Sequence, residues 1–167
     1  MTKEEILRLL RLLNDELFRE GIKGELCLYG GAVMCLAFDA RPNTKDVDAI
    51  FKPSKEIRDA VARIGRDNDM REDWLNDGVK GFVVQHPQDM FLDQSNLKIF
   101  IPEADYLLAM KTLSARVDAT DKDDVKYLIK KLNIRTVEEV FSILGKYYPQ
   151  EQVRPATKYF IEEIFQQ

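Results

Sequence analysis

The chain has 167 residues, of which 45% are apolar and 32% charged, so it can bury a core and still carry a charged surface. Its net charge of −4 argues against a general polyanion binder, which usually has an excess of lysine and arginine, but is compatible with a local basic patch. The longest apolar run, residues 32–38, is far shorter than the ~20 residues of a membrane-spanning helix. We therefore expect a globular protein that is not embedded in a membrane.

The two cysteines, Cys27 and Cys35, lie in apolar surroundings. Small secreted domains that depend on disulfides carry more cysteines, so we expect two reduced, buried thiols. The N-terminus is charged and has helical periodicity from its third residue, which is unlike a signal peptide. These features favour the cytoplasm.

The first half of the chain alternates between helix and strand patterns. Thr2 and Glu5 have the spacing of a capping box ahead of an apolar stripe, which predicts an amphipathic helix that stops at Gly21. A short buried strand is predicted over residues 26–29, followed by a buried helix over residues 32–38.

After a loop at residues 39–45, alternating polarity predicts a second strand over residues 46–51, and Ser54 is predicted to cap the next helix. A helical turn is expected around Trp74. Two further short strands are expected at residues 81–84 and 97–101.

The pattern becomes helical after Pro102. Helices are predicted over residues 103–116 and 121–132, a third after the capping pair Thr136 and Glu139, and a fourth from Pro155. We therefore predict an α/β (α+β) fold, with a small mixed sheet flanked by helices in residues 1–102 and a helical part in residues 103–167 packed on that core.

Two short motifs carry the chemistry. Asp46 and Asp48 lie on the same face of the predicted strand, about 6.6 Å apart along it, and paired carboxylates suit Mg²⁺. Gly30-Gly31 opens the preceding helix, where free amides attract phosphate and glycine permits close approach. A phosphate-binding turn beside two carboxylates is the smallest set of groups that metal-assisted phosphoryl transfer needs.

Each motif alone has an ordinary explanation. A Gly-Gly pair before a helix is usually a tight turn, and Asp-x-Asp on a half-exposed strand is usually a solvated face. Their order along the chain, on the predicted strand, helix and strand, makes the combination much more specific than either part.

The motifs resemble those of a known superfamily. Leu28-Tyr29-Gly30-Gly31, followed by Arg41, Thr44, Lys45 and Asp46-Val47-Asp48, is similar to the nucleotidyltransferase signature. More closely, the chain resembles bacterial minimal nucleotidyltransferase-like proteins related to abortive-infection toxin nucleotidyltransferases. The likeness covers roughly residues 25–145, and its later elements are Trp74–Asp77, Met110-Lys111, Ala115-Arg116 and the pair Asp121 and Asp124.

The resemblance implies a metal-dependent transfer of a nucleoside monophosphate from an NTP, with release of pyrophosphate. It implies that Asp46 and Asp48 hold Mg²⁺ or Mn²⁺, that Gly30, Gly31 and Thr44 bind the nucleotide, and that Lys111 neutralises phosphate charge. The implied partners are an NTP, a tRNA or protein acceptor, and a cognate toxin or antitoxin protein.

Many members of the superfamily place a third carboxylate on a later strand, but the predicted strand over residues 97–101 carries Lys98 and no acid. We predict that Asp121 fills this catalytic role, with Asp124 as the second choice. The alternative for Asp121 is an ordinary acidic residue in the first turn of a helix. A second overall hypothesis is an inactive nucleotide-binding or partner-docking module, as an antitoxin would be.

Two further features have weaker claims. His86 is the only histidine and lies in a Gln-His-Pro-Gln loop without other metal ligands, so we interpret it as a surface or turn residue. A run of basic residues between Lys122 and Arg135 is interpreted as a solvated helix face, with a track for RNA phosphates as the alternative.

Overall fold

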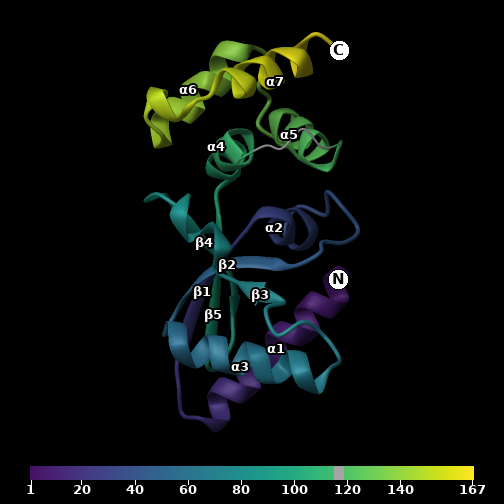
Figure 1. Ribbon diagram of the computed structural model, residues 1–167, viewed down its shortest axis with the longest axis vertical. Helices are drawn as coiled ribbons and strands as arrows, with labels where there is room; N and C mark the ends of the chain where they lie inside the picture. The colour runs from purple at the N-terminus through teal and green to yellow at the C-terminus, as the bar shows by residue number, and fades with distance from the viewer. Residues whose placement is uncertain (115–118) are drawn as a thin grey trace. The chain divides into compact units, whose positions relative to one another are not determined.

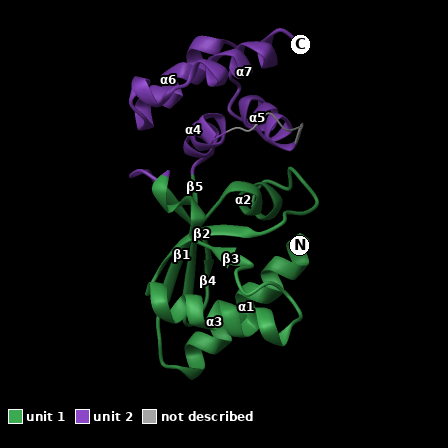
Figure 2. Cartoon of the chain, viewed as in Figure 1, with its two compact units in different colours: residues 1–81, 88–102 green, residues 82–87, 103–167 purple. Residues whose placement is uncertain are grey.

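The computed structural model describes residues 1–114 and 119–167, which form two compact units (Figure 2). The first unit comprises residues 1–81 and 88–102, and the second comprises residues 82–87 and 103–167.

The first unit is built on a mixed five-stranded sheet in the order β3-β2-β1-β5-β4. The central strand β1 runs antiparallel to β2 and parallel to β5, and β4 closes the far edge antiparallel to β5. The bounds are β1 Gly24–Tyr29, β2 Val47–Lys52, β3 Leu75–Asn76, β4 Gln88–Asp93 and β5 Leu97–Pro102. The predicted α/β class is confirmed.

Helices α1 (Lys3–Arg19) and α3 (Ser54–Asp67) pack against one face of this sheet (Figure 1). A Cβ atom added to Gly24, on β1, would lie 3.0 Å from Leu17 of α1 and 3.1 Å from Ile57 of α3. The residues of β2 that face these helices are fully or almost fully buried, namely Val47, Ala49 and Phe51. The intervening residues Asp48, Ile50 and Lys52 therefore point to the opposite face.

The N-terminal helix begins as the sequence predicted. Thr2 accepts a hydrogen bond from the Glu5 amide, the Glu5 side chain accepts one from the Thr2 amide, and the capping box is complete. The five residues of the apolar stripe are all buried completely, namely Ile6, Leu9, Leu10, Leu13 and Leu17. Helix α2 (Gly30–Leu36) follows β1 directly, and its last five residues are buried.

Several local predictions are wrong. Residues 81–84 do not form a strand: residues 78–81 form a short 3-10 helix (Gly78–Gly81), and the strand is β4, over Gln88–Asp93. The local sequence pattern did not indicate β4, because this edge strand is mostly exposed and has no buried face to impose an alternation of polar and apolar residues. Residues 71–74 form a hydrogen-bonded turn, in which the Trp74 amide donates to the Arg71 carbonyl, and the unpredicted two-residue strand Leu75–Asn76 follows it beside β2. Ser54 is the first helical residue of α3 and donates to the Phe51 carbonyl, so it does not cap the helix.

The second unit is helical. Its elements are α4 Ala104–Ser114, α5 Ala119–Lys131, α6 Val137–Tyr147, a 3-10 turn Gln150–Gln152 and α7 Pro155–Phe165. Residues 82–87 join this unit through two tyrosine hydroxyls: Tyr106 accepts from the Val84 amide, and Tyr148 donates to the Phe82 carbonyl. Ala115 and Arg116, the end of the predicted helix over residues 103–116, lie outside the described residues.

Among the residues that the structure describes, no helix is both long enough and apolar enough to cross a bilayer. The expected thiols are confirmed, since Cys27 and Cys35 are both buried and not linked.

Candidate functional site

The two aspartates lie at the start of β2. Asp48 is the second residue of the strand, Asp46 immediately precedes it, and both are half-buried. The antiparallel pairing of β1 with β2 places Asp48 opposite Tyr29, the last residue before the Gly-Gly pair. The register of the sheet therefore brings together two motifs that are separated by a long loop in the sequence.

Gly30 lies directly against Asp48. Its φ of +60° belongs to the left-handed region that favours glycine. A Cβ atom at this position would lie 3.1 Å from Asp48 Oδ2. The left-handed backbone therefore favours glycine here, and any side chain would crowd the Asp48 carboxylate.

Gly31 is covered by the loop that carries the signature. A Cβ atom added there would lie 2.5 Å from Thr44 Oγ1 and 2.6 Å from Arg41 Nη2. Arg41 therefore places a permanently charged guanidinium beside the start of α2, next to the predicted phosphate-binding turn. Arg41 belongs to the signature that the sequence displays, but no role was predicted for it, because only the folded loop shows that it contacts Gly31.

Thr44 organises this loop. Its hydroxyl donates to the Asp46 carbonyl at 3.2 Å, and its main chain pairs with Met1 through two hydrogen bonds of 3.0 and 2.7 Å. Thr44 is 8% exposed. These contacts give Thr44 a structural role in fixing Asp46, and direct binding of nucleotide by Thr44 stays a prediction.

Lys111, Asp121 and Asp124 form a charged cluster on α4 and α5, in the second unit. Lys111 Nζ lies 2.6 Å from Asp124 Oδ2 and 3.7 Å from Asp121 Oδ1. The side chains of Lys111 and Asp124 are 8% and 4% exposed, whereas that of Asp121 is 27% exposed. Asp124 is therefore committed to a buried ion pair, and Asp121 is the carboxylate of this cluster that solvent can reach.

The chemistry of Asp46 and Asp48 fits a hard divalent cation. Both are carboxylates with solvent access, and a cation such as Mg²⁺ is usually bound through one or two carboxylates plus phosphate oxygens. Within residues 1–114 and 119–167, no group of three or more histidine, cysteine or acidic side chains gathers at metal-binding spacing. A metal bound to the two aspartates would thus take its other ligands from substrate and water.

His86 is half-buried, and its ring stacks on Tyr106 with centroids 3.8 Å apart. Burial lowers the pKa of His86 below its ordinary value of 6.5. The histidine thus has a packing role within the helical unit rather than lying as a free surface residue.

The basic run on α5 is partly neutralised. Lys122 pairs with Glu163 at 2.8 Å and Lys126 donates to Gln167 at 2.8 Å, both on or next to α7. These contacts agree with a helix face that is exposed to solvent and tied to its neighbour.

A protein-family model described as "Nucleotidyltransferase of unknown function (DUF6036)" matches residues 4–160, which is nearly the whole chain. No curated protein and no solved structure gives a significant match. The family match agrees with the superfamily resemblance in the sequence, whereas no relation to a toxin follows from it.

Proposed function

This chain belongs to the nucleotidyltransferase family DUF6036, and from that premise we propose that it transfers a nucleoside monophosphate from an NTP to an acceptor hydroxyl in a metal-dependent reaction. The observation that carries the proposal is the close packing of Asp48 on Gly30, where Asp48 Oδ2 would lie 3.1 Å from a Cβ atom added to the glycine. A carboxylate site for metal and a turn suited to phosphate therefore adjoin each other.

Each residue of the site has a proposed role. Asp46 and Asp48 would hold Mg²⁺ or Mn²⁺, which when bound neutralises charge on the triphosphate and polarises the α-phosphorus. The Gly30-Gly31 turn would admit the phosphates close to the main chain, and the Arg41 guanidinium would add positive charge beside them. Thr44 would hold the loop that positions Asp46.

The acceptor oxygen attacks the α-phosphorus, the bond from that phosphorus to the pyrophosphate oxygen breaks, and the hydroxyl proton passes to a base. Asp121 is proposed as this base, because it is the carboxylate of the α4–α5 cluster with solvent access. A setting within a toxin–antitoxin pair and an RNA or protein acceptor belong to the same proposal.

A second candidate function is an inactive module that binds nucleotide or a partner protein. It is favoured by β5, which contains no acidic residue, whereas many active nucleotidyltransferases carry a third carboxylate on a later strand. The enzyme and the nucleotide-binding module both need the metal–nucleotide site and differ in turnover, whereas a partner-docking module needs neither.

The site is tested by thermal unfolding with and without Mg²⁺ plus NTP, since a ligand that binds the native state raises its melting temperature. Replacing both Asp46→Ala and Asp48→Ala should abolish the shift and leave the apoprotein as stable as before or more so, because like charges are removed. Asp15→Ala with Asp67→Ala, which removes two exposed carboxylates elsewhere in the first unit, is the matched control. A full Mg²⁺–NTP shift in the site variant would place the nucleotide elsewhere.

Turnover is tested separately by incubating the protein with labelled NTPs, Mg²⁺ and either total RNA or protein. Label transferred by the wild type and lost in the Asp46/Asp48 variant supports the enzyme. A normal Mg²⁺–NTP shift without any transfer supports the binding module.

A further inference from the structure

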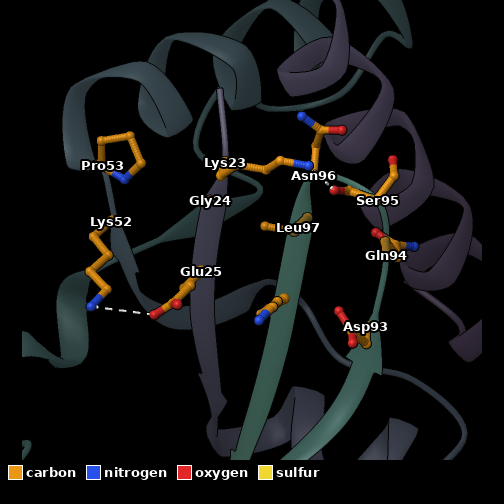
Figure 3. A pocket seen from close by; sticks show the side chains of 11 residues that line it. Lys23, Gly24, Glu25, Lys52, Pro53, Asp93, Gln94, Ser95, Asn96 and Leu97 are labelled. Carbon is orange, nitrogen blue, oxygen red and sulfur yellow. Dashed lines mark hydrogen bonds and ion pairs between the residues drawn. The ribbon is translucent and has the colours of Figure 1, made fainter. Parts of the chain in front are cut away.

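A concave site lies at the opposite end of the sheet from the Gly-Gly turn (Figure 3). It is a cavity of about 670 Å³ at the start of β1 and β5 and the end of β2, and we call it the distal groove. Its charged lining residues are Lys23, Lys52, Lys98, Glu25 and Asp93.

The charges of the distal groove form a row across four strands. Lys52 on β2 is paired in register with Glu25 on β1, Glu25 with Lys98 on β5, and Lys98 with Asp93 on β4. With Lys23 at the rim, three lysines face two acids, so the groove has a net positive charge in a chain of net charge −4.

Lys52 and Lys98 are open to an external anion, whereas Lys23 Nζ donates to the Ser95 carbonyl. The Lys52–Glu25 pair has an N–O distance of 3.3 Å, and its side chains are 77% and 45% exposed. Such surface pairs contribute at most ~1 kcal/mol, so a phosphate can compete for the lysine. Lys98 is exposed as well.

The floor of the distal groove also offers an unused hydrogen-bond acceptor. Gln94 Oε1 is buried and accepts no hydrogen bond from the described part of the chain. A buried acceptor without a donor is costly, and a side-chain rotation that opened Gln94 Oε1 to the groove would let the exocyclic amine of a nucleobase supply one.

The distal groove shares a sheet face with the catalytic aspartates. Asp48, Ile50 and Lys52 point to the same side of β2, and four residues of strand separate Asp48 from Lys52 by about 13 Å. This distance equals about four stacked nucleotides at ~3.4 Å each. Between the two ends, the half-buried side chains of Ile50 and Phe100 give the face an apolar surface.

We propose that the distal groove binds the phosphates of an RNA acceptor, upstream of the hydroxyl that reacts at Asp46 and Asp48. The inference rests on the proposed function and decides between its two acceptor classes. A serine or tyrosine of a protein acceptor would need no charged site 13 Å away, whereas a polynucleotide carries a charge at every residue.

The test is binding of a fluorescent single-stranded RNA of twelve nucleotides, followed by anisotropy over a range of salt concentrations and without NTP. The variant is Lys52→Gln with Lys98→Gln, and the control is Lys80→Gln with Lys158→Gln, two exposed lysines outside the groove. The groove variant should bind RNA roughly tenfold more weakly at low salt, and the slope of log K against log salt should fall by about 1.4, for two lost contacts of ~0.7 each. The control should match the wild type.

Three results would overturn the proposal: equal affinity and slope in the groove and control variants, loss of binding only in Lys126→Gln with Lys130→Gln on α5, or tighter binding of an acidic peptide than of RNA. Because RNA binding is measured without nucleotide, its outcome is independent of the Mg²⁺–NTP shift. A wild type that binds RNA through the groove but shows no such shift would refute the proposed function and leave the groove assignment standing.

Discussion

The buried ion pair between Lys111 and Asp124 gives a prediction that distinguishes a stabilising role of Lys111 from a role in binding phosphate. The Nζ to Oδ2 distance is 2.6 Å and both side chains are less than a tenth exposed. Replacing Asp124→Asn removes the charge but keeps the shape, and leaves the Lys111 ammonium buried with a weaker neighbour, Asp121 at 3.7 Å.

The size of the effect follows from burial. Removing one partner of a buried ion pair costs ~3–5 kcal/mol, because the remaining charge is uncompensated. Since Asp121 still offers a carboxylate, the loss for Asp124→Asn should be near the lower end, about 3 kcal/mol. For a chain of this length that corresponds to a fall in melting temperature of about 6–12 °C. Removing both charges, by Lys111→Met with Asp124→Asn, should cost clearly less than the sum of the two single changes.

The assay is urea unfolding followed by far-ultraviolet circular dichroism, with the exposed pair Lys122–Glu163 as control. Glu163→Gln should leave the free energy of unfolding nearly unchanged, because its side chain is 57% exposed. Additive effects of the two single changes would refute a stabilising ion pair between Lys111 and Asp124. The same conclusion would follow if Lys111→Met and Asp124→Asn each cost less than about 1 kcal/mol but abolished Mg²⁺–NTP binding, and that result would favour Lys111 as a phosphate ligand.

Three further predictions concern other parts of the chain. Asp121→Asn should abolish transfer while Mg²⁺–NTP binding stays nearly intact, and full transfer activity would leave Asp121 as a first-turn helix residue. Gly31→Ala should weaken NTP binding in calorimetry, because its Cβ would displace Thr44 and Arg41. Gly145→Ala, whose Cβ would point into open space beside its own helix, should bind NTP normally and gain ~0.5–1 kcal/mol of stability. Because the folded state lowers the pKa of His86 below 6.5, the unfolded chain binds the proton more readily, and stability contributed by neutral His86 is lost as pH falls below that value. The melting temperature of the wild type should therefore fall more steeply from pH 7.5 to 5.5 than that of His86→Phe, and parallel curves would contradict this.

The elements that local sequence encodes were the ones that could be predicted. The capping box of α1 joins Thr2 to Glu5, three residues apart, and its apolar stripe repeats with the helix period, so neither depends on distant contacts. The strand–Gly-Gly–helix unit and the Asp-x-Asp strand are equally local. Where the local pattern was weak, as in the edge strand β4 and the two-residue β3, prediction failed, because pairing with a neighbouring strand forms these elements.

The sequence alone therefore determined the fold class, the order of the motifs and the identity of the carboxylates and glycines. Tertiary structure decided which groups meet: Asp48 with Gly30, Arg41 with Gly31, Lys111 with Asp124, and the row of Lys52, Glu25, Lys98 and Asp93. Each of these meetings depends on strand register or helix packing between segments distant along the chain. A shift of register by one residue would turn every one of those strand side chains to the other face.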